Sequence, residues 1–454
     1  MKKVITYGSF DLFHEGHLNL LKHAKQLGDY LIVGVTSDRY DEERGKLDKS
    51  DSLVERIDHI KQTGLADLVI VEERFGQKED DIKKFGVHVF TIGSDWTGHY
   101  DHLKPLCEVV YLERTKNISS TILRKKNLSI VKIGVIGTGR IAQRMIPESR
   151  SVNGINVEAV FSPRISSAER FAERFLLDYA TDSLANLLDH VNAVYIASPH
   201  ETHYAYAKAA LEHGKHVLCE KPLCFSKQQA QELFYIAEKK EIVLMEAIKT
   251  AYAPGFTELI GVVKSGMIGE IRDVEACFTK LVQNPNAREH NPPETGGSFT
   301  ELGSYSLMAA IKLLGINYKK ISFDSIKNGN GTDLYAKAYL RYENAMATVK
   351  TGLGVKSEGR LIISGTNGYI TVVPPWWKTE EFEICFEDPS DNKKYFYKFV
   401  GEGLRYEFKS FCSAIRNNNL YSMKLTSGES IAIAGIMEAW LENRKQNGQQ
   451  SRCI

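Results

Sequence analysis

The chain has 454 residues, of which 43% are hydrophobic and 25% are charged, and its formal net charge is +1. This length exceeds that of one ordinary domain, so we expect two or three globular domains. The balanced charge gives no electrostatic reason to expect nucleic acid or a membrane surface as a partner. Seven cysteines without a C-x-x-C pair favour reduced thiols in the cytoplasm over a disulfide framework or a zinc site.

No run of apolar residues is long enough to span a bilayer, so we expect no membrane insertion. The first residues lead directly into a strand-like segment, and no signal peptide fits there. The expected location is therefore the cytoplasm.

Residues 1–128 alternate apolar, strand-like runs with amphipathic, helix-like segments. Strands are expected at Val4–Tyr7, Tyr30–Thr36, Leu68–Val71, Val87–Ile92 and Glu108–Tyr111, and helices at His17–Leu27, Leu53–Thr63 and Glu79–Phe85. This alternation predicts a doubly wound parallel sheet whose ligand lies at the carboxyl ends of the strands. Asp38 and Gly93–Trp96 follow such strands and would lie at that edge.

Two histidines mark the junction between the first strand and the first helix. The strand ends at Gly8, and His14 and His17 lie just before the helical pattern. Backbone N–H groups and the positive end of a helix dipole favour phosphate at such a junction. The pair suits a nucleotide α-phosphate that gains charge in a transition state. Taken alone, it fits surface histidines or metal ligands equally well.

The wider stretch resembles the glycerol-3-phosphate cytidylyltransferases of the H-x-G-H nucleotidyltransferase superfamily. The matching segments cover nearly all of residues 1–128: Tyr7–Leu12 with His14 and His17, Gly28–Tyr30, Gly93–Trp96, Cys107–Leu112 and Arg114–Thr121. The resemblance implies that a polyol phosphate attacks the α-phosphorus of CTP and releases pyrophosphate. Such a reaction depends on positioning and on charge stabilisation.

The resemblance also assigns residues to these tasks. It implies four catalytic residues: His14, His17, Lys46 and Arg114. It implies CTP contacts at Tyr7, Gly8, Ser9, Phe10, Asp11, Asp95, Thr115, Ser119 and Ser120. Mg²⁺ is expected on the triphosphate, and no metal ligand from the protein is predicted. Asn117, Phe75 and Gly64 depart from the family pattern, which leaves the acceptor alcohol phosphate open.

The strand–helix pattern starts again near residue 130. Ile130–Ile136 predicts a buried strand, and Gly137–Ala142 then reads G-T-G-R-I-A at a helix start, which is a dinucleotide fingerprint. Further parallel strands are expected at Val157–Phe161, Ala193–Ala197, His216–Cys219 and Ile242–Met245. The pattern therefore predicts a Rossmann domain.

From about Ile271 the sequence alternates β-branched and aromatic residues with polar ones. This pattern predicts an open antiparallel sheet with one covered face. Its expected strands are Val274–Phe278, Tyr335–Tyr342, Ala347–Thr351, Leu361–Ile363, Tyr369–Val373 and Phe382–Phe386. A last helix is expected at Ser427–Arg444, followed by a polar tail that we expect to be disordered.

From Val131 onward the chain resembles the Gfo/Idh/MocA family of NAD(P)-dependent oxidoreductases. The resemblance rests on the fingerprint, on Ser198–His203 and on Val217–Pro222. It implies cofactor contacts at Gly137, Thr138, Gly139, Arg140, Ile141, Ser162, Arg164, Ser198, Pro199, His203, Glu220 and Lys221. No carboxylate follows the second strand, where Ser162 and Arg164 suit a 2′-phosphate, so NADP is favoured over NAD. Arg164 could instead stack on the adenine.

The implied catalytic residues of this half are Lys221, Glu301 and Tyr305. Lys221 follows a buried strand, where a partly desolvated lysine can polarise a substrate oxygen. Tyr305 stands where many family members have histidine, and it can donate a proton to an alkoxide when a lysine cation lowers its pKa. Glu301 stands one turn earlier, where the family usually has aspartate. The alternative for Tyr305 is an aromatic packed at a domain interface.

The two resemblances together predict an α/β chain with four parts. A cytidylyltransferase-like domain (1–128) precedes a Rossmann domain (130–250), an α+β substrate and oligomerisation domain with a largely antiparallel sheet (251–445), and a tail (446–454). We expect a bifunctional enzyme that makes a CDP-activated polyol from small-molecule substrates, as a homo-oligomer. Two alternatives stay open: a non-catalytic cofactor-binding second half, and a nucleotidyltransferase for another acceptor.

Overall fold

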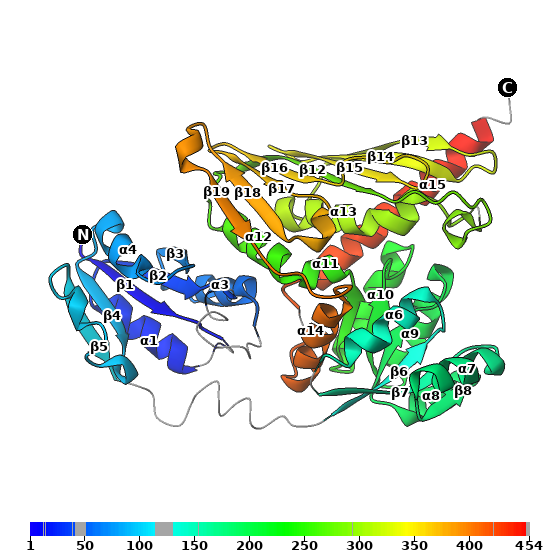
Figure 1. The fold of residues 1–454 in the computed structure, drawn as a ribbon, viewed down its shortest axis with the longest axis horizontal. Helices are drawn as coiled ribbons and strands as arrows, with labels where there is room; N and C mark the ends of the chain where they lie inside the picture. Colours follow the sequence, from blue (N-terminus) through cyan, green and yellow to red (C-terminus); the bar gives the residue numbers. More distant parts are fainter. Residues whose placement is uncertain are drawn as a thin grey trace. The chain divides into compact units, whose positions relative to one another are not determined.

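The computed structural model describes most of the chain. Outside the described residues are Leu12, His14, Arg39, 41–50, 114–129, Asn153, Pro293, Tyr421 and 451–454, together with the side chains of Asp95 and of 447–450. The chain forms two compact units (Figure 1): residues 1–128 with 257–267, called unit 1, and residues 129–256 with 268–454, called unit 2. Among the described residues, no helix is long and apolar enough to cross a membrane.

Unit 1 contains a five-stranded sheet with the order β3-β2-β1-β4-β5. Its strands are β1 (Lys3–Gly8), β2 (Tyr30–Thr36), β3 (Leu68–Glu72), β4 (Val89–Gly93) and β5 (Glu108–Leu112), and its helices are α1 (Glu15–Gln26), α3 (Leu53–Gln62) and α4 (Gln77–Phe85). Every neighbouring pair is parallel. The strand order reverses beside β1, so the carboxyl end of β1 lies at the switch point where doubly wound sheets bind ligands.

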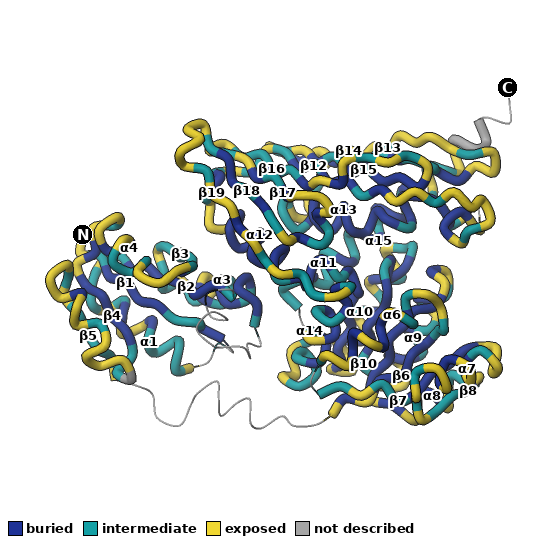
Figure 2. The backbone as a smooth tube through the Cα atoms, viewed as in Figure 1, coloured by how far each residue is buried: buried dark blue, intermediate teal, exposed yellow. Residues whose placement is uncertain are grey.

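Both faces of this sheet are buried. Along β1, Val4 joins one apolar cluster and Ile5 joins the cluster on the opposite face, because successive strand side chains point to opposite sides. Helix α3 begins with a capping box in which Ser52 and Glu55 satisfy each other's backbone N–H groups. Figure 2 shows the resulting band of buried residues along the strands.

Unit 2 contains a six-stranded parallel sheet with the order β11-β10-β9-β6-β7-β8. Its strands are β6 (Val131–Ile136), β7 (Ile155–Phe161), β8 (Tyr179–Thr181), β9 (Ala193–Ile196), β10 (His216–Glu220) and β11 (Leu244–Ala247). Its helices are α6 (Arg140–Ser149), α7 (Ile165–Phe175), α8 (Leu184–His190), α9 (His203–Glu212) and α10 (Lys227–Lys239). The predicted Rossmann sheet is confirmed.

The second sheet of unit 2 has eight strands in the order β13-β14-β15-β12-β16-β17-β18-β19. These are β12 (Ile271–Thr279), β13 (Lys320–Lys327), β14 (Asp333–Arg341), β15 (Met346–Gly352), β16 (Leu361–Gly365), β17 (Tyr369–Val372), β18 (Glu381–Cys385) and β19 (Lys393–Phe396). The neighbours are antiparallel except for β12 and β15, which run parallel. Helix α13 (Ser298–Leu314) packs on β12, β14 and β15 and covers one face of the mixed sheet (Figure 1).

Further helices complete unit 2, and the last of them corrects an expectation. They are α11 (Lys249–Tyr252), α14 (Leu404–Arg416) and the final helix α15 (Ser427–Gln450), while α12 (Pro254–Lys264) lies mainly in the segment grouped with unit 1. We expect disorder in the polar tail Gln446–Ser451, but α15 continues to Gln450. Gln446, Gln449 and Gln450 propagate a helix at little cost once it is nucleated. The proposed division of 130–445 at residue 250 stays a prediction.

Gly34 in β2 offers a test of the packing in unit 1. A Cβ atom there would lie 2.2 Å from the ring of Tyr7 on the neighbouring strand β1. Gly34→Ala is therefore expected to destabilise unit 1 by about 1–3 kcal/mol through overpacking. Hydrogen exchange of the β1 and β2 peptides during urea titration measures this loss. Gly93→Ala is the control, since its Cβ would meet open space, and equal effects of both changes would contradict the packing argument.

Candidate active sites

The carboxyl end of β1 in unit 1 carries the residues predicted to contact a nucleotide. Tyr7 is buried, and its hydroxyl donates a 2.9 Å hydrogen bond to Asp81 Oδ2 of α4. Burial, with the Asp81 carboxylate next in weight, raises the pKa of Tyr7 above its usual value. The Lys78 ammonium lies 4.6 Å from the centre of the Tyr7 ring. Tyr7 is thus a fixed, protonated part of the sheet, with its hydroxyl already engaged.

Phe10 and Asp11 turn the chain from β1 into α1. Phe10 is buried with a left-handed φ of 53°, and its ring meets the His17 ring at 5.4 Å between centroids. The Phe13 ring also contacts His17, at 5.7 Å between centroids. The buried Asp11 accepts a 2.8 Å hydrogen bond from the backbone N–H of Asp51. The two aromatic rings therefore fix the half-buried His17 imidazole in the first turn of α1.

Arg56 of α3 joins two strand ends, and the sequence analysis missed it. Its guanidinium is fully buried and donates to the carbonyl oxygens of Ser9 at 2.7 Å and of Thr36 at 2.8 Å. It also forms an ion pair of 2.5 Å with Asp38 Oδ1. An arginine in an amphipathic helix reads as a solvent-facing residue, so the pattern gave no signal for this role. Arg56 holds the turn after Gly8 against the end of β2.

Several predicted residues of this half cannot be placed. His14, Lys46, Arg114, Thr115, Ser119 and Ser120 lie outside the described residues, as does the side chain of Asp95. Gly8 and Ser9 lie with Tyr7, Phe10, Asp11 and His17 at the end of β1. Among the described residues of the whole chain, no three His, Cys, Asp or Glu side chains are grouped to hold a metal ion.

In unit 2 the loop after β6 forms a backbone cradle. Gly137 has a φ of 108°, and a Cβ atom there would lie 2.7 Å from the carbonyl oxygen of Ala197. Gly139 is the N-cap of α6, and no side chain caps that terminus. Open N–H groups at a helix start beside glycines fit a dinucleotide pyrophosphate. Thr138 accepts from Gln143 through its carbonyl, and Ile141 is half-buried in the first turn.

Two predicted cofactor positions lie after β7. Ser162 is buried, and its hydroxyl accepts from the backbone N–H of Arg164 at 3.4 Å. Arg164 is the exposed N-cap residue of α7. The hydroxyl of Ser162 and the guanidinium of Arg164 thus belong to one turn, as a 2′-phosphate site would require.

His203 joins the two loops that follow β9 and β10. Its fully buried ring lies between the carbonyl oxygens of Pro222, at 2.8 Å, and of Ser198, at 3.1 Å. Burial lowers the pKa of His203 to about 4 against the opposing effect of these carbonyls, so the ring is neutral at pH 7. The Ser198 hydroxyl bonds Thr202 at 2.7 Å, just past Pro199. His203 therefore acts as a buried brace between the loops.

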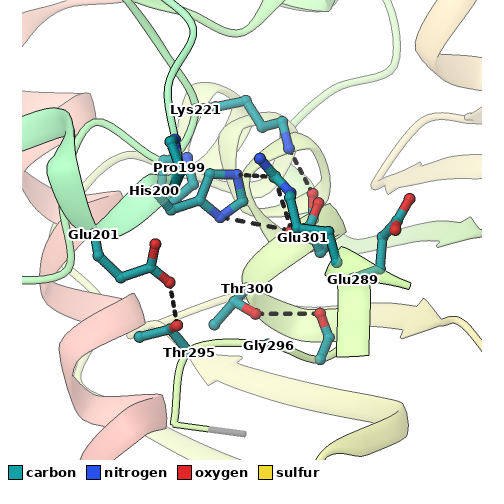
Figure 3. A network of polar contacts seen from close by, with 12 residues as sticks. Pro199, His200, Glu201, Lys221, Glu289, Thr295, Gly296, Thr300 and Glu301 are labelled. Atoms are coloured by element: carbon teal, nitrogen blue, oxygen red, sulfur yellow. Dashed lines mark hydrogen bonds and ion pairs between the residues drawn. The ribbon is translucent and has the colours of Figure 1, made fainter. Parts of the chain in front are cut away.

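Lys221, Glu301 and Tyr305 are brought together as predicted (Figure 3 shows the first two). The Lys221 ammonium donates a 2.7 Å hydrogen bond to the backbone carbonyl of Glu301 and lies 5.8 Å from the centre of the Tyr305 ring. Tyr305 follows one turn later on α13 and is 9% exposed. A cation, a phenol and a helix end thus meet at the carboxyl edge of β10.

The expected direction of the Tyr305 pKa shift is wrong. We expected Lys221 to lower it, but burial raises the pKa of Tyr305 well above its usual value, and the carboxylates of Glu220, Glu407 and Glu301 add to the rise. The free energy needed to remove a phenolate from water exceeds the stabilisation that the Lys221 ammonium gives it. The Tyr305 hydroxyl is therefore protonated throughout the neutral range.

The Glu301 carboxylate contacts Arg288 and His200. Its Oε1 atom lies 3.1 Å from Arg288 Nη2 and 3.6 Å from His200 Nδ1, and Arg288 also contacts His200 Nε2 at 3.0 Å (Figure 3). Burial lowers the pKa of His200, and the charge of Lys221 lowers it further. The neutral ring can then accept from Arg288 at Nε2 and present Nδ1–H to Glu301. Sequence reasoning gave neither His200 nor Arg288 a role, since both stand in segments without a periodic signal.

Two further buried carboxylates, those of Glu220 and Glu407, act electrostatically on Tyr305. Glu220 Oε1 accepts a 2.6 Å hydrogen bond from the Tyr195 hydroxyl, and Glu220 Oε2 accepts a 3.3 Å hydrogen bond from the backbone N–H of Lys221. Burial raises the pKa of Glu220. Glu407 of α14 is fully buried, and neither carboxylate oxygen has a hydrogen-bond partner among the described residues. Burial raises its pKa strongly as well, and the Glu220 charge adds to the effect.

Comparisons with known proteins fit the two sites. The model of the family described as "Cytidylyltransferase-like" matches residues 5–126. Two further family models match the rest: "Oxidoreductase family, NAD-binding Rossmann fold" over residues 131–248 and "GFO/IDH/MocA C-terminal domain" over residues 256–371. Residues of unit 1 are 46% identical to glycerol-3-phosphate cytidylyltransferase of Staphylococcus aureus, over 28% of this chain and 95% of that protein.

The remainder is similar to dehydrogenases and reductases. It is 28% identical to scyllo-inositol 2-dehydrogenase (NADP(+)) IolU of Bacillus subtilis, over 70% of this chain and 98% of that protein. The crystal structure of KijD10, a 3-ketoreductase from Actinomadura kijaniata, in complex with NADP and TDP-benzene, is 25% identical, with a TM-score of 0.59 over 68% of this chain and 97% of that one. The chain therefore belongs to the cytidylyltransferase-like family over residues 5–126 and to the Gfo/Idh/MocA oxidoreductase family over residues 131–248 and 256–371.

Proposed function

We propose that this chain is a bifunctional enzyme that makes a CDP-activated polyol. The second half reduces a keto or aldehyde sugar phosphate to a polyol phosphate, and the first half transfers a cytidylyl group to it from CTP. The proposal rests on one observation: a single chain carries both the His17 turn of unit 1 and the Lys221–Glu301–Tyr305 group of unit 2. Fusion of the two suggests consecutive steps on one substrate.

In the first reaction, His17 and His14 hold the α-phosphate while the polyol phosphate attacks. Lys46 and Arg114, with Thr115, Ser119 and Ser120, hold the outgoing pyrophosphate, and Mg²⁺ accompanies the triphosphate. Arg56 supports this site indirectly, since it fixes the Ser9 carbonyl. Only charge stabilisation and positioning are required, because no covalent intermediate forms.

In the second reaction, the nicotinamide cofactor supplies or accepts the hydride when bound. Lys221 orients the substrate carbonyl oxygen, and the protonated Tyr305 hydroxyl donates a proton as the alkoxide develops. Glu301 keeps Lys221 in place through its backbone carbonyl. NADP is favoured because Ser162 and Arg164 follow β7 and because a solved relative holds NADP. The names of the relatives, an inositol dehydrogenase and a 3-ketoreductase, support a ketone and a secondary alcohol.

The coupled reaction tests the whole proposal. Enzyme supplied with NADPH, CTP, Mg²⁺ and dihydroxyacetone phosphate, or a pentulose phosphate in a parallel panel, is expected to form a CDP-polyol that mass spectrometry identifies. The product should require both NADPH and CTP. If unit 1 never accepts the alcohol that unit 2 produces, the consecutive-step proposal is wrong.

His17→Ala is expected to slow pyrophosphate release from CTP by about 10²–10³-fold, the usual loss when a group facing developing charge is removed. NADPH oxidation by the same protein should continue at the parent rate. The control is His23→Ala, an exposed histidine on the same helix. Pyrophosphate release at the parent rate in the His17 variant would refute the phosphate-binding role.

Tyr305→Phe is expected to lower NADPH-dependent reduction by about 10²–10⁴-fold while cytidylyl transfer continues. The raised pKa of Tyr305 keeps the donor protonated, so kcat for reduction in the parent should show no tyrosine ionisation between pH 6 and 10. Tyr235→Phe, at an exposed tyrosine of α10, is the control. A fall of kcat with an apparent pKa below 10, abolished in the Phe variant, would contradict this assignment.

A further inference from the structure

The dinucleotide loop of unit 2 is tied to the connection between β12 and α13, residues 280–297, here called the β12–α13 loop. Arg140 is the first residue of α6, directly after Gly139. Its Nη2 atom lies 2.6 Å from Glu289 Oε1, although the two residues are 149 positions apart. The arginine side chain is 62% exposed and the glutamate side chain only 6%. An exposed cation thus reaches a carboxylate that is nearly buried.

Glu289 is an anion with two cationic neighbours. Lys280 Nζ lies 3.5 Å from the same Oε1 atom that Arg140 contacts. Burial acts to raise the pKa of Glu289, but the hydrogen bond from Arg140 and the two positive charges bring it to about 2. The carboxylate is therefore ionised at neutral pH. If Arg140 moves away, Lys280 still compensates the charge.

The position of Arg140 is that of a phosphate ligand. It opens a helix whose N-terminus has no side-chain cap, beside the cradle formed by Gly137 and Gly139. A dinucleotide pyrophosphate in this cradle would bring its negative charges to the same helix end. Glu289 then competes with the pyrophosphate for one guanidinium, and it also repels the pyrophosphate.

We propose that Glu289 holds Arg140 in the cofactor-free enzyme and that the cofactor's pyrophosphate takes Arg140 over on binding. Glu289 is thus a positioning residue that sets cofactor affinity, and the inference rests on the dinucleotide site of the proposed function. The exchange also reaches the reacting groups, since Glu289 directly follows Arg288, which contacts both His200 and Glu301. Cofactor binding thereby alters the β12–α13 loop next to the substrate.

The sign of one affinity change tests the exchange. Glu289→Gln removes the competing charge and is expected to tighten NADPH binding about two- to fivefold, which corresponds to the free energy of one ion pair whose arginine is exposed. Titration calorimetry or the fluorescence of bound NADPH measures this without turnover. Glu294→Gln is the matched control, because it removes the same charge from the same loop at an exposed residue that lies near Arg444.

A second variant separates competition from simple repulsion. Arg140→Gln should weaken NADPH binding, and the gain from Glu289→Gln should be smaller in the Arg140→Gln background than in the parent. Weaker or equal binding in the single Glu289→Gln variant, with an unchanged unfolding temperature, would overturn the exchange. It would show that Glu289 only orients Arg140. If the parent itself binds neither NADPH nor NADH, the proposed function of unit 2 fails instead.

Discussion

The hydrogen bond from the Lys221 ammonium to the Glu301 backbone carbonyl is the interaction on which the reacting centre of unit 2 depends. It joins the carboxyl end of β10 in the parallel sheet to α13, which covers the mixed sheet. A lysine bound to a carbonyl keeps its charge and two further N–H donors. Because Tyr305 follows on the same helix, this bond also sets the distance between cation and phenol. The parallel sheet therefore contributes one reacting group through the end of β10, and the helix that covers the mixed sheet contributes the other.

Burial controls the protonation of this centre more than the nearby cation does. Tyr195 and Tyr305 both lie among carboxylates, and desolvation raises the pKa of each. Glu407 has no hydrogen-bond partner among the described residues and is driven to the neutral form. The surroundings thus keep Tyr305 and Glu407 in their protonated forms, so that a proton is present to be donated to a developing alkoxide. Removal of a proton from an alcohol would have to work against the same surroundings.

Sequence patterns predicted the central strands well and the edge strands only in part. Tyr30–Thr36 and Ala193–Ile196 are central strands, and their apolar runs gave nearly the observed bounds. Of the edge strands of these sheets, β8, β13 and β19 were missed, whereas β3, β5 and β11 were predicted. Most side chains of β13 are exposed, so this strand leaves only a weak apolar pattern. The structure brings together Lys221 and Tyr305, which the motifs singled out. Arg56 and Arg288 escaped, since contacts between distant segments leave no local periodicity.

The parallel pairing of β12 with β15 affects how unit 2 reaches its native state. Two adjacent parallel strands cannot be joined by a tight turn, and the chain between them, residues 280–345, includes α13 and the β13–β14 pair. The centre of the mixed sheet closes only when this long excursion has returned, which is a slow, non-local step. A nascent chain that stops before β15 thus already contains the whole dinucleotide loop. The helix α13 that carries Tyr305, however, still lacks the completed sheet on which it packs.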